Sequence, residues 1–397
     1  MSGTCEATLK EQLDQLLSEP MDVAKERART TFDKVAESCN NRFVLIGAGN
    51  MGRRILAQLR SEGIKPIVFT DNQKSQWGNT IDGLDVIPPE EASARFGDNV
   101  TFIVTIYNNH HSFPNTRDQF LALGCKKVIS VIPVRWKYYE NFLPYFRDDL
   151  PQKVLAQTGH IREAFTLLFD EPSRREFVAQ VAWRLHGDFD ILGTPDPAQE
   201  YFPKDIVLLT ANEFFVDVGA YDGDTIQQFL NLSEAKFYRV IALEPDTCNF
   251  SKLVKYISEL PAELADKIVP HALAASNRTC RRRFRNGEGL AATLSDKGLT
   301  EVNCVTLDDL LLGQHPTYIK MDIEGAEIDA IEGGIRVIRK ESPVLAVCAY
   351  HAQDHLWNIP IAIHRINPQY ALFLRPHMTE CWDTVCYAIP PERMLSS

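Results

Sequence analysis

FFVDVGAYDGDT, residues 214–225, is the stretch of sequence that decides the fold. Its apolar beginning is typical of a buried strand, and a glycine-containing loop then leads into a segment that favours a helix. Phosphate-binding loops favour neutral or basic side chains, whereas this loop carries Asp217, Asp222 and Asp224 and so suits a cationic ligand. S-Adenosylmethionine has a sulfonium and an ammonium group but no phosphate. Because Gly219 and Gly223 would let its methionine part lie against the backbone, the loop predicts a site for this cofactor.

The next expected strand, residues 239–243, ends in Glu244 and Pro245. Glu244 lies 25 residues after Gly219. At this place in a Rossmann-like fold, an acid can accept hydrogen bonds from both hydroxyls of a ribose. The two motifs together therefore predict the two ends of one cofactor site.

Two later strands also end in polar side chains. A strand over residues 317–321 is followed by Asp322 and Glu324, and a strand over residues 343–349 is followed by His351. Ligands of open α/β sheets bind outside the carboxyl ends of the strands, so we expect these side chains to face the same crevice as the cofactor loop. The series closes with two further expected strands, residues 370–375 and 384–389, one of them antiparallel.

The block from about residue 213 to residue 390 resembles the FkbM family of S-adenosylmethionine-dependent methyltransferases. The motifs that carry the resemblance are "FVDVGAYDGDT", "IALEPD", "VTLDDL", "IKMDIEGAE" and "YHAQDHLW". The family implies methyl transfer to oxygen, often on sugars or polyketide-like small molecules. The late acidic motif of the family corresponds to Lys320, Asp322, Glu324 and Glu327. The residues that we predict to bind the cofactor are Asp217, Gly219, Ala220, Gly223, Asp224, Thr225, Glu244, Pro245, Asp322 and Glu324.

Methyl transfer to oxygen is an in-line displacement at the sulfonium methyl, and the acceptor hydroxyl must lose one proton. Alignment of the reacting atoms can contribute about 7–11 kcal/mol, and a general base about 10²–10⁴-fold. We predict that His351 or Asp322 is the base and that Lys320 orients the acids or the substrate. A metal-assisted mechanism, in which Asp322, Glu324 and His351 bind Mg²⁺ or Mn²⁺, is chemically reasonable. Because the spacing is generic, no metal is predicted.

A second glycine loop, GAGNMG at residues 47–52, lies between an expected strand and an expected helix. Gly47, Gly49 and Gly52 form the pattern G-x-G-x-x-G, and Asp71 follows 24 residues after Gly47. In a dinucleotide-binding fold the glycines let a pyrophosphate approach the helix, and the acid holds a ribose. The pattern predicts a nucleotide site but does not identify its ligand.

This segment also resembles the N-terminal domain of the sugar acyltransferases that modify nucleotide-linked amino sugars. The resemblance runs from "VLIGAGNMGRRI" through "VFTDNQKSQWGNTIDGLDVIPPEE" and implies a site for a nucleotide-sugar. Two other interpretations stay open: NAD as the ligand, or a domain that serves assembly and binds nothing. No acid or base suited to hydride transfer follows Val131, which disfavours a dehydrogenase.

Strands that alternate with helices predict an α/β fold with two doubly wound, Rossmann-like domains, the second with the seven-stranded sheet of class I methyltransferases. Leucines at helical spacing near the N-terminus predict helices that cap the next domain or form a homodimer. The expected divisions are N-terminal helices at 1–41, a nucleotide- or nucleotide-sugar-binding domain at 42–134, a helical connector at 135–212 and the methyltransferase domain at 213–397.

The composition narrows the classes of partner. The formal net charge of -11 disfavours nucleic acids and anionic membranes as partners, and no apolar stretch approaches the roughly 18 residues of a membrane span. The nine cysteines lack metal-site spacing, and a reducing cytoplasm is the expected location.

The leading expectation is therefore an S-adenosylmethionine-dependent O-methyltransferase with a small-molecule or saccharide acceptor. The acceptor hydroxyl is expected on a sugar, a nucleotide-sugar or a glycan precursor. Two alternatives stay open: a methyltransferase that acts on a lipid or secondary metabolite, and a non-catalytic nucleotide-binding module.

Overall fold

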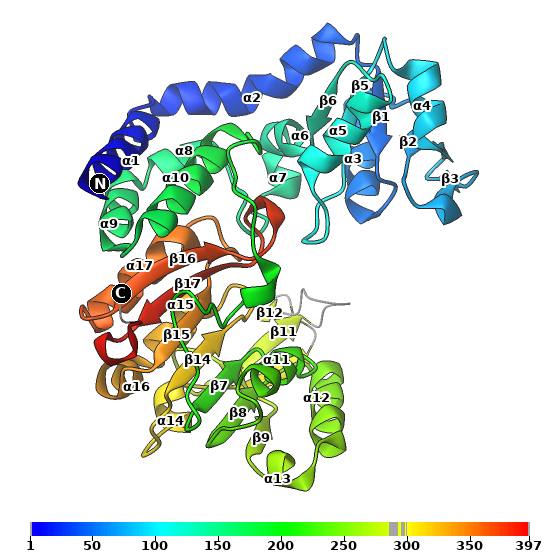
Figure 1. The fold of residues 1–397 in the computed structure, drawn as a ribbon. Helices are drawn as coiled ribbons and strands as arrows, with labels where there is room; N and C mark the ends of the chain where they lie inside the picture. The colour runs from blue at the N-terminus through cyan, green and yellow to red at the C-terminus, as the bar shows by residue number, and fades with distance from the viewer. Residues whose placement is uncertain (1, 286–292, 295–297, 299, 396–397) are drawn as a thin grey trace.

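The computed structural model describes residues 2–285, 293–294, 298 and 300–395 of the chain. Its two main sheets have six and seven strands. The first lies at the upper right of Figure 1 and the second in its lower half, with helices packed on both. The predicted α/β class, with mainly parallel sheets and alternating helices, is confirmed. Among the described helices, none combines the length and apolar character needed to cross a membrane.

Two helices open the chain, α1 (Ser2–Leu17) and α2 (Met21–Ser38). Pro20 separates them because it lacks a backbone N–H and disfavours helix in the preceding residue. Helix α1 packs on α10 (Glu171–His186), and α2 runs along the upper side of Figure 1 toward the first sheet. Both N-terminal helices therefore pack within the chain, mainly on helices of its middle segment.

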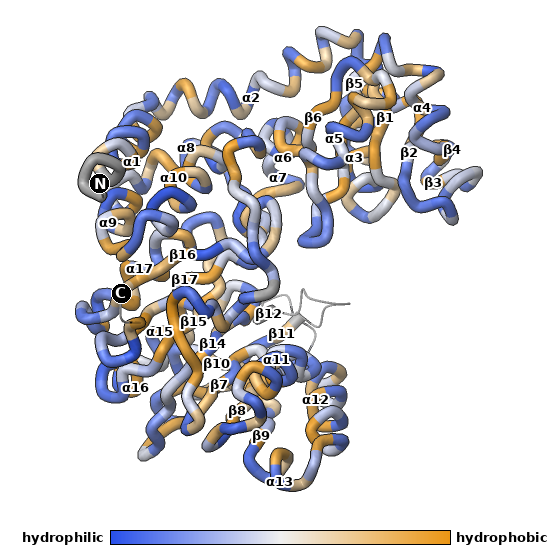
Figure 2. The backbone as a smooth tube through the Cα atoms, in the orientation of Figure 1, coloured by the Kyte–Doolittle hydropathy of each residue, from blue (hydrophilic) through white to orange (hydrophobic). Residues whose placement is uncertain are grey.

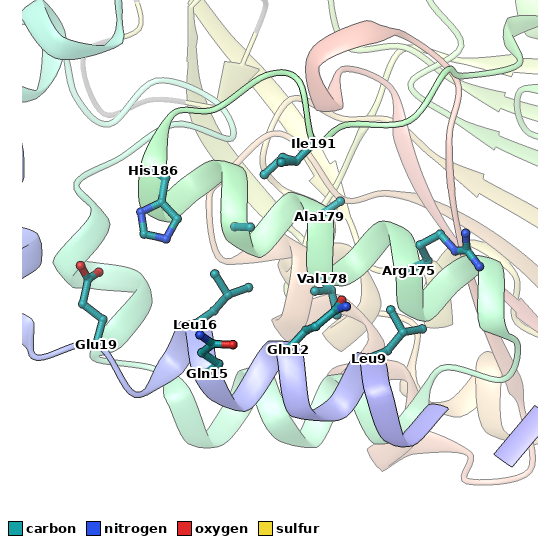
Figure 3. Close-up of a pocket in the computed structure, with 11 residues that line it drawn as sticks. Leu9, Gln12, Gln15, Leu16, Glu19, Arg175, Val178, Ala179, His186 and Ile191 are labelled. Carbon is teal, nitrogen blue, oxygen red and sulfur yellow. The ribbon is translucent and has the colours of Figure 1, made fainter. Parts of the chain in front are cut away.

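A groove of about 590 Å³ lies between α1 and α10 (Figure 3). Leu9 and Leu16 of α1 face Val178 of α10 across it. The neighbouring leucines of α1, Leu13 and Leu17, are buried within the chain. The apolar face that suggested a homodimer is thus largely covered by the chain itself, and the homodimer stays a prediction without that support.

The first sheet has the strand order β3-β4-β2-β1-β5-β6, and every neighbouring pair is parallel except β3 and β4. The order reverses between β1 and β5, which opens a crevice at the carboxyl ends of these strands. The central strands are continuous hydrophobic runs, as expected of strands covered on both faces (Figure 2). The elements are β1 (Phe43–Ile46), α3 (Asn50–Ser61), β2 (Phe69–Thr70), β3 (Thr80–Ile81), β4 (Leu84–Ile87), α4 (Pro89–Phe96), β5 (Thr101–Val104), α5 (Phe113–Ala122) and β6 (Val128–Ser130).

The middle of the chain is helical, as the periodicity predicts. Its helices pack on both neighbours: α2 contacts α6 and α8, while α9 packs on α17 and α10 packs on β16. Their bounds are α6 (Ile132–Lys137), α7 (Tyr139–Phe142), α8 (Pro151–Leu155), α9 (Thr158–Leu167) and α10; the partners α17 (His355–Ile366) and β16 (Ala371–Pro376) follow later in the chain.

Buried charges join this helical part to the last strands. Arg135 Nη1 lies 2.7 Å from Asp148 Oδ2, and the Arg135 side chain is fully buried. The guanidinium of Arg147, also fully buried, lies 3.8 Å from the centre of the Trp382 ring. Because a buried charge is costly unless it is paired or stacked on aromatic rings, these contacts fix how the connector meets the second sheet.

The second sheet has the order β16-β17-β15-β14-β7-β8-β9. Strand β17 runs antiparallel to both β15 and β16, whereas the other described pairs are parallel. The predicted seven-stranded sheet with one antiparallel strand is confirmed. The elements are β7 (Phe214–Val218), α11 (Asp224–Leu232), β8 (Arg239–Leu243), α12 (Thr247–Glu259), α13 (Ala262–Ala265), β9 (Ile268–His271), α14 (Leu307–Leu310), β14 (Tyr318–Met321), α15 (Glu327–Glu332), α16 (Ile335–Glu341), β15 (Val344–Cys348), α17, β16 and β17 (Thr384–Ile389).

A small four-stranded sheet interrupts this series and was not predicted. Its order is β10-β13-β11-β12, with β11 paired antiparallel to β13. Arg282 of β11 reaches Asp329 on α15 at 3.0 Å, which ties the small sheet to the main one. The strands are β10 (Ala274–Ala275), β11 (Cys280–Arg285), β12 (Thr293–Leu294) and β13 (Thr300–Val305).

Candidate active site

The glycine loop after β7 lies directly against the end of β14. Gly219 has a φ of +85°, and a Cβ atom there would come within 1.9 Å of the carbonyl oxygen of Asp322. Gly223 has a φ of +98°, and a Cβ atom there would lie 2.6 Å from the Tyr256 ring. Any other residue would have to push these neighbours away in a backbone conformation that L-residues disfavour. The loop can therefore take this path only with glycine at both positions.

Asp217 and Lys320 form a buried pair beneath the loop. Lys320 Nζ lies 3.1 Å from Asp217 Oδ1 and donates a hydrogen bond of 2.7 Å to the carbonyl of Gly219. Burial raises the pKa of Asp217 to about 6, although the Lys320 charge opposes this shift. Lys320 thus connects β14 to β7 and to the loop, which agrees with an orienting role.

Glu244 lies at the end of β8, on the other side of the same loop. Its two carboxylate oxygens accept backbone N–H groups, one from Tyr221 at 2.9 Å and one from Asp246 at 2.8 Å. A carboxylate has about four lone-pair positions, so both oxygens keep capacity for ribose hydroxyls. Burial raises the pKa of Glu244 to about 7.

The remaining predicted cofactor residues surround these two acids. Ala220 is fully buried and donates its N–H to the carbonyl of Leu243 at 2.9 Å. Asp224 and Thr225 open α11, where Asp224 Oδ1 accepts the N–H of Thr225 at 2.7 Å. Pro245 is half-buried beside Glu244. The structure brings these residues together around the carboxyl ends of β7 and β8.

A second group of charges lies at the ends of β14 and β15. His351 Nδ1 lies 2.8 Å from Glu327 Oε1, and His351 Nε2 lies 3.3 Å from Asp322 Oδ1 and 3.8 Å from Glu324 Oε2. The side chains of His351 and Glu327 are buried, while Asp322 keeps 26% of its side-chain surface. The three predicted residues Asp322, Glu324 and His351 therefore do meet, as the argument from strand ends expects.

The protonation of His351 follows from these neighbours. Burial alone would disfavour the imidazolium, but the carboxylates of Glu327, Glu324 and Asp322 outweigh it and raise the pKa of His351 to about 10. Burial and the charges of Asp322 and Glu327 raise the pKa of Glu324 to about 8, although His351 opposes the shift. Both ring nitrogens of His351 face carboxylates, and without a bound cation the raised pKa favours the imidazolium, which has no lone pair to accept a proton.

Three residues of this group were missed by the sequence analysis. Tyr201 donates its hydroxyl to Asp322 Oδ2 at 2.8 Å, and its ring centre lies 5.0 Å from Lys320 Nζ. Burial and the charges of Asp383 and Asp322 raise the pKa of Glu200 to about 8. Asp383 lies close enough to Asp322 for burial and that charge to raise its pKa to about 6. All three come from irregular segments, where no periodic pattern marks a residue as part of a site.

The first glycine loop borders a cavity of about 520 Å³ at the carboxyl ends of β1, β2 and β5. Gly47, Gly49 and Asp71 line it, and Asp71 Oδ2 accepts the N–H of Ala48 at 3.0 Å. Gly52 does not line the cavity. Its role is packing, because a Cβ atom there would lie 2.1 Å from the carbonyl oxygen of Gly47.

Aromatic rings connect this cavity to the charged group. Tyr107 and Tyr145 line the cavity, with ring centres 5.6 Å apart. Tyr145 contacts Phe146 at 4.9 Å, and the Phe146 ring lies 6.1 Å from the ring of His351. The two predicted sites are thus joined by continuous packing.

The predicted cofactor residues fall within a known protein family model. Residues 217–381 match the model of the methyltransferase FkbM domain. This part of the chain is an FkbM methyltransferase domain. The matched residues contain Asp217, Glu244, Asp322 and His351. Family and fold together support a methyltransferase function.

Solved structures extend the likeness of fold to the whole chain. The methyltransferase FkbM from Methylobacillus flagellatus KT superposes with a TM-score of 0.75 at 22% identity, over 97% of this chain and 99% of that one. A putative rRNA-methylase from Clostridium thermocellum reaches a TM-score of 0.34 at 9% identity, over 52% of this chain and 99% of that one. The latter similarity is too low to carry an argument. No curated protein matches the chain.

Proposed function

We propose that the chain is an S-adenosylmethionine-dependent O-methyltransferase. The observation that carries this proposal is the set of acids at three adjacent strand ends: Glu244 after β8, Asp217 at β7 and Asp322 after β14. Glu244 suits the ribose, and the loop at Gly219 leaves backbone exposed to the methionine part. The acid-rich surroundings favour a sulfonium over a phosphate-bearing cofactor.

For the acceptor, we propose a hydroxyl of a sugar, a nucleotide-sugar or a glycan precursor. Support comes from the sequence resemblance of the first domain and from the cavity beside Gly47 and Gly49, which packs through aromatic rings toward His351. A lipid or secondary metabolite is the alternative acceptor. A purely binding role is disfavoured, because the acids at the strand ends lie together as a methyl-transfer site requires.

The geometry favours Asp322 over His351 as the group that takes the acceptor proton. The bond from oxygen to the methyl carbon forms, the bond from the methyl carbon to sulfur breaks, and S-adenosylhomocysteine leaves with the electron pair. Asp322 is partly exposed and carries acceptor oxygens, whereas both nitrogens of His351 face carboxylates. His351 then holds and orients Asp322 rather than accepting the proton itself.

Acceptor screening tests this proposal. The purified chain is incubated with S-adenosylmethionine and, separately, with nucleotide-sugars, free sugars, lipids and small polyketides, and both S-adenosylhomocysteine and the methylated product are measured by mass spectrometry. We expect a product heavier by one methylene, with the new methyl on oxygen. If the chain is active but methylates only carbon or nitrogen atoms, the O-methyltransferase assignment would be contradicted.

S-Adenosylhomocysteine is expected to bind about fourfold more weakly at about pH 6.5 than at about pH 8, given a Glu244 pKa of about 7. Ribose hydroxyls donate to the ionised carboxylate, so affinity is present above this pKa and is lost as the pH falls through it. The N–H groups of Asp246 and Tyr221 and the charge of Lys320 favour the ionised form, and burial opposes it. Asp217, with a pKa of about 6, titrates mostly below this window.

Calorimetric titration at the two pH values measures this effect, with Glu244→Gln as the matched variant. That variant should bind more weakly at both values and lose most of the pH dependence. Tighter binding at the lower pH in the unaltered chain would count against ribose recognition by Glu244.

Gly49→Leu is expected to abolish nucleotide-sugar binding in the first cavity without loss of the fold. Gly49 has φ −77° and ψ −167°, and no atom lies within 4 Å of a Cβ built there, so the new side chain would project into the space of the ligand. The change at the N-cap of α3 should cost at most about 1 kcal/mol. Titration with UDP-glucose and UDP measures binding, and unaltered S-adenosylhomocysteine binding serves as control. Equal UDP-glucose binding by both proteins would exclude this cavity.

A further inference from the structure

We propose that Asp322, Glu324 and His351 bind one divalent cation and that Glu327 orients the imidazole for it. The proposal deepens the proposed function, because an ion here would lie on the acceptor side of the methyl-transfer site. The candidate atoms are His351 Nε2, Asp322 Oδ1 and Glu324 Oε2.

The separations of these atoms suit a shared ion. With bonds of about 2.1 Å, two ligand atoms at a right angle lie roughly 3.0 Å apart, and wider angles bring this to about 4 Å. His351 Nε2 lies 3.3 Å from Asp322 Oδ1 and 3.8 Å from Glu324 Oε2. An ion bound to His351 Nε2 would therefore lie within reach of both carboxylates.

His351 is held as a ligand histidine would be. Its side chain is only 1% exposed, and its Nε2 atom has no hydrogen-bond partner among the described residues. Its other nitrogen, Nδ1, lies 2.8 Å from Glu327 Oε1, and that oxygen also accepts the N–H of Ile323 at 2.9 Å. Metal-bound histidines commonly have such a carboxylate behind the ring, which fixes the tautomer and directs the other nitrogen. Binding of the ion would displace the proton that Nε2 carries in the imidazolium. The arrangement therefore aims a buried nitrogen between Asp322 and Glu324.

The surrounding charge also favours a cation. Beside the two proposed carboxylate ligands, Glu327 Oε1 lies 2.8 Å from His351 Nδ1, so three carboxylates surround one imidazole. Carboxylates crowded around one point are stabilised by a bound cation, because its charge offsets their repulsion. The sulfonium of the cofactor would supply a positive charge as well, so the experiment must separate the two cations.

One imidazole nitrogen with carboxylate oxygens, and room for further oxygen ligands, is a set that suits Mn²⁺ or Mg²⁺. The remaining positions could take the acceptor oxygen, whose hydroxyl an ion would acidify. Asp322 can bind the ion through Oδ1 and still accept a proton, since a carboxylate has about four lone-pair positions. The ion and the assigned proton acceptor are therefore compatible.

Binding of Mn²⁺ tests the proposal directly. The full chain is titrated with MnCl₂ in the presence of S-adenosylhomocysteine, which is uncharged at sulfur, and free Mn²⁺ is followed by electron paramagnetic resonance. We expect one saturable site per chain. Glu324→Gln and His351→Gln should each weaken it at least about tenfold. Glu259→Gln, which alters an exposed carboxylate on α12, is the matched control and should bind Mn²⁺ as the unaltered chain does.

The outcomes separate this proposal from the methyltransferase assignment. Saturable Mn²⁺ binding that Glu324→Gln weakens and Glu259→Gln does not would support the site. Absence of saturable binding, in protein that binds S-adenosylhomocysteine, would overturn the metal site and leave the cofactor assignment standing. Equal Mn²⁺ binding by Glu324→Gln and the unaltered chain would also overturn it, because the ion would then lie elsewhere. Because Glu324 keeps 19% of its side-chain surface, its variant should fold even if His351→Gln does not.

Discussion

Gly219→Ala is expected to weaken S-adenosylhomocysteine binding by at least about 100-fold, which corresponds to about 2.7 kcal/mol. The added Cβ atom would lie 1.9 Å from the carbonyl oxygen of Asp322, and a φ of +85° is strained for alanine. The ends of β7 and β14 would have to separate, and Lys320 would lose its bond to the Gly219 carbonyl. Calorimetry measures the affinity, and thermal unfolding shows whether the fold survives.

Gly159→Ala is the matched control for this change. Gly159 lies in α9, and no atom lies within 4 Å of a Cβ built there. The same chemical change should therefore leave both affinity and unfolding temperature nearly unaltered. If Gly219→Ala bound S-adenosylhomocysteine as the unaltered chain does, the glycine loop would not be the cofactor site.

Asp322→Asn is expected to lower kcat by about 10²–10⁴-fold, the usual contribution of a general base. An amide keeps the size of the side chain and can still accept the hydroxyl of Tyr201, but it cannot take up the acceptor proton. Asp322 is among the predicted cofactor residues, but S-adenosylhomocysteine has no sulfonium charge to attract it and the change spares the residues around Glu244. Binding of S-adenosylhomocysteine should therefore stay within a few fold. Turnover of the acceptor identified by screening is the measurement.

Asp266→Asn, at an exposed position beyond α13, controls for a nonspecific loss of charge. A further comparison separates proton transfer from metal binding: Mn²⁺ affinity is measured on the same Asp322→Asn sample. If Asp322→Asn retained turnover within about twofold, Asp322 would be excluded as the base.

Much of the proposed cofactor site could be predicted because each of its elements has a local signature. Residues 214–218 form a continuous apolar run, the form that a central parallel strand requires, and β7 occupies that range. Gly219 and Glu244 follow from the order of strand, loop and next strand, since strand ends in one sheet meet at one edge. The comparison with the FkbM methyltransferase domain agrees with the resemblance seen in these motifs.

The proposed acceptor side was harder to predict from the sequence, because its residues contact one another across long separations in the chain. Tyr201 lies 121 positions before Asp322 in the chain and comes from an irregular segment, yet it donates a hydrogen bond to that acid. The sequence placed His351 at the right strand end but gave no sign that Glu327 lies behind its ring. That contact changes the expected chemistry, because it turns a candidate base into an imidazole that Glu327 orients toward Asp322 and Glu324.

The small sheet and the first glycine loop also depend on contacts that the local sequence does not reveal. Strand β11 carries several arginines, and its pairing with β12 and β13 explains why such a polar segment is extended. In the first loop, the pattern G-x-G-x-x-G predicts the same role for all three glycines. In the structure, Gly47 and Gly49 line the cavity, whereas Gly52 packs against the loop backbone. Spacing alone does not distinguish these roles.

Calorimetric titration of the intact chain with S-adenosylhomocysteine, repeated with Glu244→Ala, shows whether the cofactor binds at the loop between β7 and α11. We expect one site per chain with a micromolar dissociation constant. The substitution should raise this constant at least about tenfold, since each hydrogen bond to a charged group contributes about 1.5–3 kcal/mol. A folded chain that shows no saturable binding, or binding that Glu244→Ala leaves unaltered, would contradict the assignment of the cofactor and its site.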